Sequence, residues 1–449
     1  MRDRPLSHRE HARALMKLAW PLIGSQMMQF AIGLTDAIML GWYSLEAFAA
    51  QVLGGSFFFI ILILGSGFAF GLQPMVANAQ AKGDDQQIRR STRMGFWLVL
   101  IYAAVTVPFL LFAEPILVAI GQDPQLSLDA DIYLKIMAYS VFPALMVNVL
   151  RSYLSALEQA GIILYMTIVA LTLNAVVNYV LIFGNFGFPQ LGLRGAAVAS
   201  LSVHIISFLI LAIYAARKNR RHSLFQRFWR PDPEAFWRVF RLGWPIGITV
   251  LAEVGMFTAA TAMVGWVSVV EVGAHGIALQ VASLSFMFHL GLSHAVTVRA
   301  GAAQGRGDWQ GLRRGAGVSL VISFCVAALA SISFILFPET LLKVFVSPSE
   351  PNLEALLIRG TTLLYIAAAF QFFDAMQVMG TGLLRGLQDT KIPMYFATLS
   401  YWVIGVGSGY VLGFVLNWDA VGVWFGLTLG LAAATVLMLG RFRMLAYAE

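Results

Sequence analysis

Long apolar runs alternate with short polar clusters along almost the whole chain. A helix that crosses a bilayer needs about 20 mostly apolar residues. Ending each run at a cluster of charged or turn-forming residues predicts an all-α integral membrane fold with twelve transmembrane helices. The predicted spans lie near 14–40, 47–80, 92–120, 131–156, 161–184, 192–216, 238–268, 272–302, 314–345, 354–385, 392–416 and 421–442.

The composition favours the same class of protein. Of the 449 residues, 59% are hydrophobic and 12% are charged, whereas an ordinary globular protein has about 25% charged residues. This number of charges is too small to cover the surface of a cytosolic enzyme. The remaining surface is therefore expected to face the lipid bilayer. The single cysteine, Cys325, excludes a disulfide framework and a cysteine metal cluster.

The basic residues indicate how the chain is oriented. The formal net charge is +7, but the basic residues fall between apolar runs rather than along one helix face, so we expect no nucleic-acid partner. Positive charge in membrane proteins collects on the cytoplasmic side. The predicted spans place nearly all Lys and Arg on the side of the N-terminus and predict cytoplasmic termini. The exceptions are Lys135, Arg194, Lys343 and Arg359.

The sequence contains an internal repeat. LAWP, which begins at Leu18, recurs as LGWP from Leu242, a shift of 224 residues, and further matches follow at shifts up to 230. The repeat predicts two six-helix lobes of like orientation, 1–216 and 242–449, joined by a basic cytoplasmic linker, 217–241. Parallel repeats around a central site are an architecture of secondary transporters, because two bundles can expose that site alternately to each side.

Three acidic residues lie well inside predicted spans, where a charge costs about 2.5–3.5 kcal/mol or more. They are Asp36, Glu253 and Asp374, and we find no Lys or Arg in the same spans to neutralise them. Asn174 and Asn178 are one helical turn apart, so they share a helix face. Helical rise places them at a depth similar to that of Asp36, which permits one pocket of a carboxylate and two amides.

Glu253 and Asp374 each lie about 20 Å from the outer end of their own spans, so they can face one another across the second lobe. A buried carboxylate can hold a proton, Na⁺ or an organic cation. Competition among these is the physical basis of antiport. We therefore expect cation binding at the three acids and the two asparagines, with Na⁺ one candidate at Glu253 and Asp374.

Several other chemistries are excluded by missing motifs. The chain has no phosphate-binding G-x-x-x-x-G-K-[ST] loop, no H-E-x-x-H and no G-x-S-x-G. His289 and His294 are not at metal-ligand spacing. We expect no enzyme activity, no resident metal and no cofactor beyond the coupling ion, H⁺ or Na⁺.

The chain resembles multidrug and toxic compound extrusion (MATE) transporters, specifically the NorM-like branch. The resemblance covers nearly the whole chain and rests on AWPLI, TDAIMLG, NAVVNYVLIFGNFGFPQLGLRGAA, VRAGAAQGRGD and RGLQDTKIP. It implies two six-helix bundles in the bacterial inner membrane. The implied activity is efflux of lipophilic cations against inward H⁺ or Na⁺. We expect the transporter to act as a monomer.

By the same resemblance, Asp36, Asn174 and Asn178 match the amino-lobe site, and Glu253 and Asp374 match the carboxy-lobe acids. Asn178 departs from branches that carry a second Asp there, which weakens any mechanism based on an Asp pair.

Pro21 matches a family proline linked to helix bending, since proline removes a helical hydrogen bond. Two alternatives remain open: a flippase for lipid-linked precursors, which would need cationic residues in its cavity, and an integral-membrane enzyme.

Overall fold

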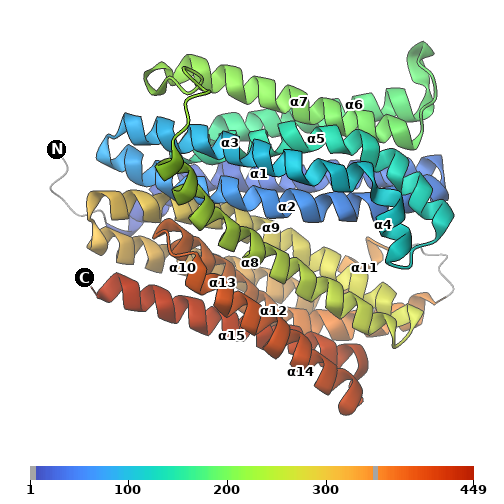
Figure 1. Ribbon diagram of the computed structural model, residues 1–449. Coiled ribbons are helices and arrows are strands. Elements are labelled where there is room, and N and C mark those ends of the chain that lie inside the picture. Colours follow the sequence, from blue (N-terminus) through green and yellow to red (C-terminus); the bar gives the residue numbers. More distant parts are fainter. Residues whose placement is uncertain (1–6, 347–351, 449) are drawn as a thin grey trace. The chain divides into compact units, whose positions relative to one another are not determined.

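The computed structural model describes residues 7–346 and 352–448, and every regular element in those two ranges is helical. Eleven helical segments are long and apolar enough to cross a membrane. The described part of the chain adds a twelfth long helix, α1, whose apolar stretch is interrupted by polar residues. The predicted twelve-helix membrane fold is confirmed (Figure 1). The long segments are α1 (His8–Tyr43), α2 (Leu45–Lys82), α3 (Asp85–Leu111), α5 (Pro124–Ala156), α6 (Ala160–Phe183), α7 (Leu193–Lys218), α8 (Pro233–Gly265), α9 (Val269–Arg306), α10 (Trp309–Leu336), α12 (Leu353–Gly386), the run α13 to η4 (Lys391–Val415) and α15 (Asp419–Tyr447).

Two predicted spans are divided in the structure. The span predicted at 92–120 consists of α3 and a short helix, α4 (Ala113–Ala119), and the span at 314–345 consists of α10 and α11 (Pro338–Lys343). Pro338 occupies the first turn of α11. Proline has no N–H to donate to the preceding turn, so α10 ends before it and a new helix begins.

The repeat seen in the sequence recurs in the helix caps. Ser44 and Ser268 are the N-caps of α2 and α9, and each hydroxyl accepts a hydrogen bond from the backbone N–H three residues later. The same helices end at Gly83 and Gly307, with φ of 73° and 69°. A left-handed residue at this position favours glycine. The repeat therefore conserves the local chemistry that starts and stops these helices.

The helix ends in the second half of each repeat also correspond. The C-cap residue of both α5 and α12 is a leucine, and the residue after it has positive φ: Glu158 (φ 57°) and Gln388 (φ 60°). Each of the two helices packs on three other long helices. α5 packs on α2, α3 and α7, and α12 packs on α9, α10 and α15.

The chain divides into two compact units. The amino unit is Gly24–Gly247, and the carboxy unit is Met1–Ile23 with Ile248–Glu449. These boundaries differ from the predicted lobes, because the start of α1 packs against α9 within the carboxy unit. Trp20 contacts Phe288 edge-on at 6.3 Å between ring centroids, and a side chain at Gly291 would meet the backbone of Ile23 at 2.5 Å. The lobes 1–216 and 242–449 stay a prediction.

The linker is attached to the amino unit at several points. Arg90 donates to Asp232 and to Glu234, and Trp97 Nε1 donates to the Phe228 carbonyl at 2.8 Å. The Arg90 guanidinium holds the pKa of Asp232 below its usual value. The linker therefore packs on α3 as part of the fold, in addition to carrying positive charge.

A buried histidine fixes the start of the linker. His222 is fully buried; its Nδ1 lies 2.6 Å from the Tyr153 hydroxyl, and its Nε2 lies 3.2 Å from Asp85 Oδ1. Burial lowers the pKa of His222, because a buried imidazole loses the hydration that stabilises its charged form. The ring of His222, with its neutral form favoured, therefore joins the start of the linker to α3 and α5.

Candidate functional site

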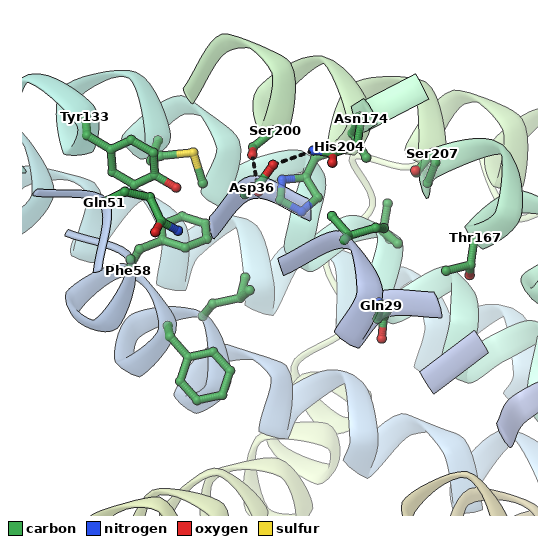
Figure 2. Close-up of a pocket in the computed structure, with 18 of the residues that line it drawn as sticks. Gln29, Asp36, Gln51, Phe58, Tyr133, Thr167, Asn174, Ser200, His204 and Ser207 are labelled. Carbon is green, nitrogen blue, oxygen red and sulfur yellow. Dashed lines mark hydrogen bonds between the residues drawn. The ribbon is translucent and has the colours of Figure 1, made fainter. Parts of the chain in front are cut away.

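The structure brings three of the predicted residues together in the amino unit. Asp36 Oδ1 accepts hydrogen bonds from Asn174 Nδ2 at 2.8 Å and from Asn178 Nδ2 at 2.6 Å. Ser200 Oγ donates to Asp36 Oδ2 at 3.3 Å. The four side chains come from α1, α6 and α7, and Figure 2 shows Asp36 between Asn174 and Ser200. The i, i+4 spacing on α6 is what directs both amides to one carboxylate.

The site holds its carboxylate with neutral donors alone. Among the described residues no Lys or Arg lies within salt-bridge distance of Asp36. Asp36 is 8% exposed, and both asparagines are fully buried. The negative charge is therefore stabilised but not neutralised, which leaves it available to a cation.

Ser200 was missed by the sequence analysis. Its signal in the sequence is a hydroxyl within a run of small residues, GAAVASLS, where helices can approach closely. One acceptor is also left over: Asn178 Oδ1 is buried without a hydrogen-bond partner in the part of the chain described.

A cavity of about 460 Å³ opens beside Asp36 within the amino unit. Apolar side chains such as Phe58, Phe59 and Met137 form most of its wall, and polar groups are spaced along it, including Gln29 and Tyr133 (Figure 2). A volume of this size suits a drug-sized molecule, and a mostly apolar wall with few polar groups is typical of small-molecule sites. Gln29 is the repeat counterpart of Glu253, so each half has a polar side chain at this position.

The carboxy unit contains two acids, Glu253 on α8 and Asp374 on α12. The two acids interact electrostatically with each other. Asp374 is 2% exposed. Glu253 Oε1 and Asp374 Oδ1 are both buried, and neither has a hydrogen-bond partner among the residues with described positions. Two unpartnered carboxylate oxygens in one apolar bundle can share a proton or a small cation.

Contrary to expectation, one basic residue of these spans interacts with an acid, Glu253. Arg385 belongs to α12, the helix of Asp374, and its charge interacts with Glu253. Arg385 was expected to be one of the cytoplasmic charges, because it lies at the end of its predicted span, and α12 does end at Gly386. Glu253 thus has a counter-charge within the carboxy unit, whereas no Lys or Arg in the described part of the chain lies within salt-bridge distance of Asp36.

Pro21 lies inside α1, which is continuous from His8 to Tyr43. A role in bending stays a prediction. In residues 7–346 and 352–448, no group of three or more His, Cys, Asp or Glu side chains is arranged to hold a metal ion.

Comparison with known proteins agrees with this architecture. The family model MatE matches residues 21–180 and 245–411. The chain is 47% identical over 434 residues to a probable multidrug resistance protein NorM of Rhizobium meliloti, covering 96% of this chain and 93% of the relative. It is 43% identical over 441 residues to the protein of the same description from Agrobacterium fabrum, covering 98% and 95%.

A solved structure described as the outward-facing conformation of a multidrug resistance MATE family transporter has the same fold. Its TM-score is 0.89 at 19% identity, and the match covers 98% of this chain and 96% of that one. The two matched segments of the family model correspond to the two halves of the repeat. The chain belongs to the MATE family, among its NorM-like multidrug efflux transporters.

Proposed function

We propose that this transporter exports lipophilic organic cations in exchange for H⁺ or Na⁺ by alternating access. The observation that carries the proposal is Asp36. Its carboxylate is held by Asn174, Asn178 and Ser200, faces a largely apolar cavity of about 460 Å³, and has no basic partner among the described residues.

This arrangement suits a cation with an apolar body. The cavity wall receives the apolar part of the substrate, because burying apolar surface contributes about 25 cal/mol per Å². Asp36 supplies the charge complement, since it is the one carboxylate among the described residues that line the cavity. A proton or Na⁺ that binds the same carboxylate removes that complement, so the ion and the substrate exclude each other.

Glu253 and Asp374 provide a second place for ion coupling. Their orphaned oxygens favour uptake of a proton or Na⁺, and the positive charge of Arg385 partly offsets the negative charge of Glu253. Coupling follows if occupancy of these acids favours one of the two transport conformations. The coupling ion can then act in both units, while the substrate binds in the amino unit.

The test uses purified protein in proteoliposomes loaded with a fluorescent lipophilic cation, with the H⁺ and Na⁺ gradients imposed separately. The proposal expects one of the two gradients to drive transport against the cation's own gradient. Transport that responds to neither ion gradient would refute antiport. A neutral analogue of the same dye is the control for leakage through the lipid.

We also propose that the protein resides in the bacterial inner membrane as a monomer, with both termini cytoplasmic. The support is the collection of basic residues on the side of the N-terminus. A topology reporter inserted in the linker is expected to read cytoplasmic, and a periplasmic signal there would overturn this orientation.

A further inference from the structure

A small cavity in the carboxy unit is separate from the two sites described above. It measures about 40 Å³ and lies between the start of α1, the end of α9 and the start of α10. One water needs about 10–15 Å³ of such space, whereas a drug-sized molecule needs about 300 Å³ or more. The cavity therefore fits a small group. Its polar lining side chains are His11, Arg299, Arg306 and Asp308.

His11 has hydrogen-bonding capacity that the described residues do not use. Its side chain lines the cavity and is 4% exposed, and neither ring nitrogen has a hydrogen-bond partner in the described part of the chain. A β-carbon at Gly315 of α10 would lie 3.5 Å from His11 Nδ1, so the glycine leaves space beside this edge of the ring. Most buried polar groups in proteins are hydrogen-bonded, so an imidazole with two unpartnered nitrogens beside a cavity points to a ligand.

The charges around His11 favour an anion. Arg299 and Arg314 both act electrostatically on the imidazole, and Asp308 is the carboxylate that opposes them. Arg306 adds a guanidinium to the cavity wall and is exposed, so the cavity can be reached from solvent. Asp308 is already engaged as the N-cap of α10, where its carboxylate accepts a backbone hydrogen bond at 2.7 Å. Positive charge therefore outweighs negative charge at this cavity.

The internal repeat shows that the fold does not require a histidine and an arginine here. At the shift of 224 residues, His11 corresponds to Ala235 and Arg299 to Met75, and both counterparts are buried in the amino unit. Three lining residues of α10 are smaller than their counterparts: Gly311, Gly315 and Ala316 correspond to Gln87, Ser91 and Thr92. The carboxy unit therefore combines extra space with polar side chains at positions where apolar or bulkier residues serve the amino unit.

We propose that His11, Arg299 and Arg306 bind a phosphate group in this cavity, either free phosphate or the phosphate of a lipid headgroup. A guanidinium can form two parallel hydrogen bonds with phosphate oxygens, and a protonated imidazole is a donor at both nitrogens. The bound group joins α1 to α9. This inference concerns the carboxy unit alone and does not depend on the transport function proposed above.

The test measures binding of inorganic phosphate to the full-length protein, purified in a neutral detergent and exchanged into phosphate-free buffer. Isothermal titration calorimetry gives the Kd, with potassium chloride at matched ionic strength as the reference. The wild type is expected to bind phosphate saturably and to unfold at a higher temperature in phosphate than in chloride, since a ligand of the folded state stabilises it. A wild type that shows neither effect would mean that the cavity holds only water, and would overturn the inference.

Two variants introduce the residues of the amino unit. His11→Ala and Arg299→Met should each weaken phosphate binding about tenfold or more, the usual effect of losing a charge-assisted hydrogen bond. Gly315→Ser, which also introduces the amino-unit residue, should weaken binding by filling space beside His11. The control is Lys391→Gln, which removes an exposed positive charge at the start of α13, outside the cavity lining, and should bind phosphate as the wild type does.

A Kd that stays at the wild-type value in folded His11→Ala and Arg299→Met protein would place the anion elsewhere and overturn the inference. The same conclusion follows if both variants unfold at lower temperatures by equal amounts in phosphate and in chloride, because the two residues then only support the fold. If one variant does not fold, the other and Gly315→Ser decide the question.

A short-chain lipid distinguishes the two sources of the phosphate. Dihexanoyl phosphatidylglycerol carries a phosphate on a lipid backbone, and dihexanoylglycerol is its control without the phosphate. Displacement of inorganic phosphate by the phospholipid alone would support the inference and assign the site to a headgroup, whereas displacement by neither would assign it to free phosphate. Displacement by dihexanoylglycerol as well would show that acyl chains occupy the site, and would overturn the assignment to a phosphate group.

Discussion

The substitution Asp36→Asn removes one charge from the amino-unit site and keeps its shape. An asparagine at this position presents a carbonyl oxygen that can accept from Asn174 and Asn178, as Asp36 Oδ1 does at 2.8 and 2.6 Å. Its amide then faces the Ser200 hydroxyl, which can rotate to accept. We therefore expect the variant to fold and to insert in amounts close to the wild type.

The expected effect on cation binding is large. A unit charge about 4 Å from Asp36 gains about 4 kcal/mol at an effective dielectric constant of about 20, and about 1 kcal/mol in bulk water. The site lies between these limits, since Asp36 is nearly buried but faces an open cavity. The dissociation constant of a lipophilic cation should therefore rise by roughly tenfold to a thousandfold.

The assay is equilibrium binding of a fluorescent lipophilic cation to purified protein, with a neutral analogue of matched shape as the second ligand. Binding of the neutral analogue should change little, because it depends on the apolar wall. Cation affinity that stays at the wild-type value in correctly folded Asp36→Asn protein would refute the assignment of Asp36 to cation binding.

Three further predictions follow from the other parts of the molecule. Asp374→Asn should reduce ion-driven efflux far more than the amount of folded protein in the membrane, and equal losses in a transport assay and a membrane blot would indicate a structural role. Glu253→Gln should reduce the dependence of transport on the ion gradient while the substrate still binds; an unchanged dependence would contradict the coupling role. Burial lowers the pKa of His222, so the imidazole takes up a proton more readily when the linker is released than when it is attached. The attachment of the linker should therefore be stable above pH 6.5 and weaken as the pH falls below that value. Limited proteolysis of the linker across pH 5–7 tests this, with pH-independent cleavage as the contrary result and His222→Gln as the control expected to lose the pH dependence.

Much of the fold was predictable because membrane insertion imposes a simple length rule on apolar runs. The repeat was equally accessible, since the residues that cap helices, such as Ser44 and Ser268, recur at a fixed shift. The breaks at Phe112 and Phe337 were less accessible. Glu114, Pro115, Pro338 and Glu339 follow these breaks, but apolar residues resume within a few positions of each, so a hydropathy window runs across them.

The amino-unit site was predictable to the extent that the spacing of residues along a helix determines where their side chains lie. The helical spacing of Asn174 and Asn178 and their depth relative to Asp36 were enough to group them. Ser200 lies on a third helix, and no spacing rule relates α7 to α1. Its approach to Asp36 depends on how the helices pack, which a single sequence does not encode locally.

The sequence also failed to predict where the side chains of two arginines lie. Arg151 and Arg385 were both counted as cytoplasmic orientation charges, because each lies near the end of a predicted span. Helix direction and side-chain length bring both into the bundles instead. The linker also contains a contact that its position in the sequence did not indicate: Asp232 pairs with Arg90, which is 142 residues away.

Gradient-driven transport in proteoliposomes tests the central claim most directly. The wild type and Asp36→Asn are reconstituted in equal amounts, and accumulation of a lipophilic cation is followed while an H⁺ or Na⁺ gradient is imposed alone. We predict concentrative transport by the wild type with one of the two gradients, and its loss in Asp36→Asn. Cation transport that merely follows the cation's own gradient, or that persists at wild-type rate in Asp36→Asn, would contradict the account.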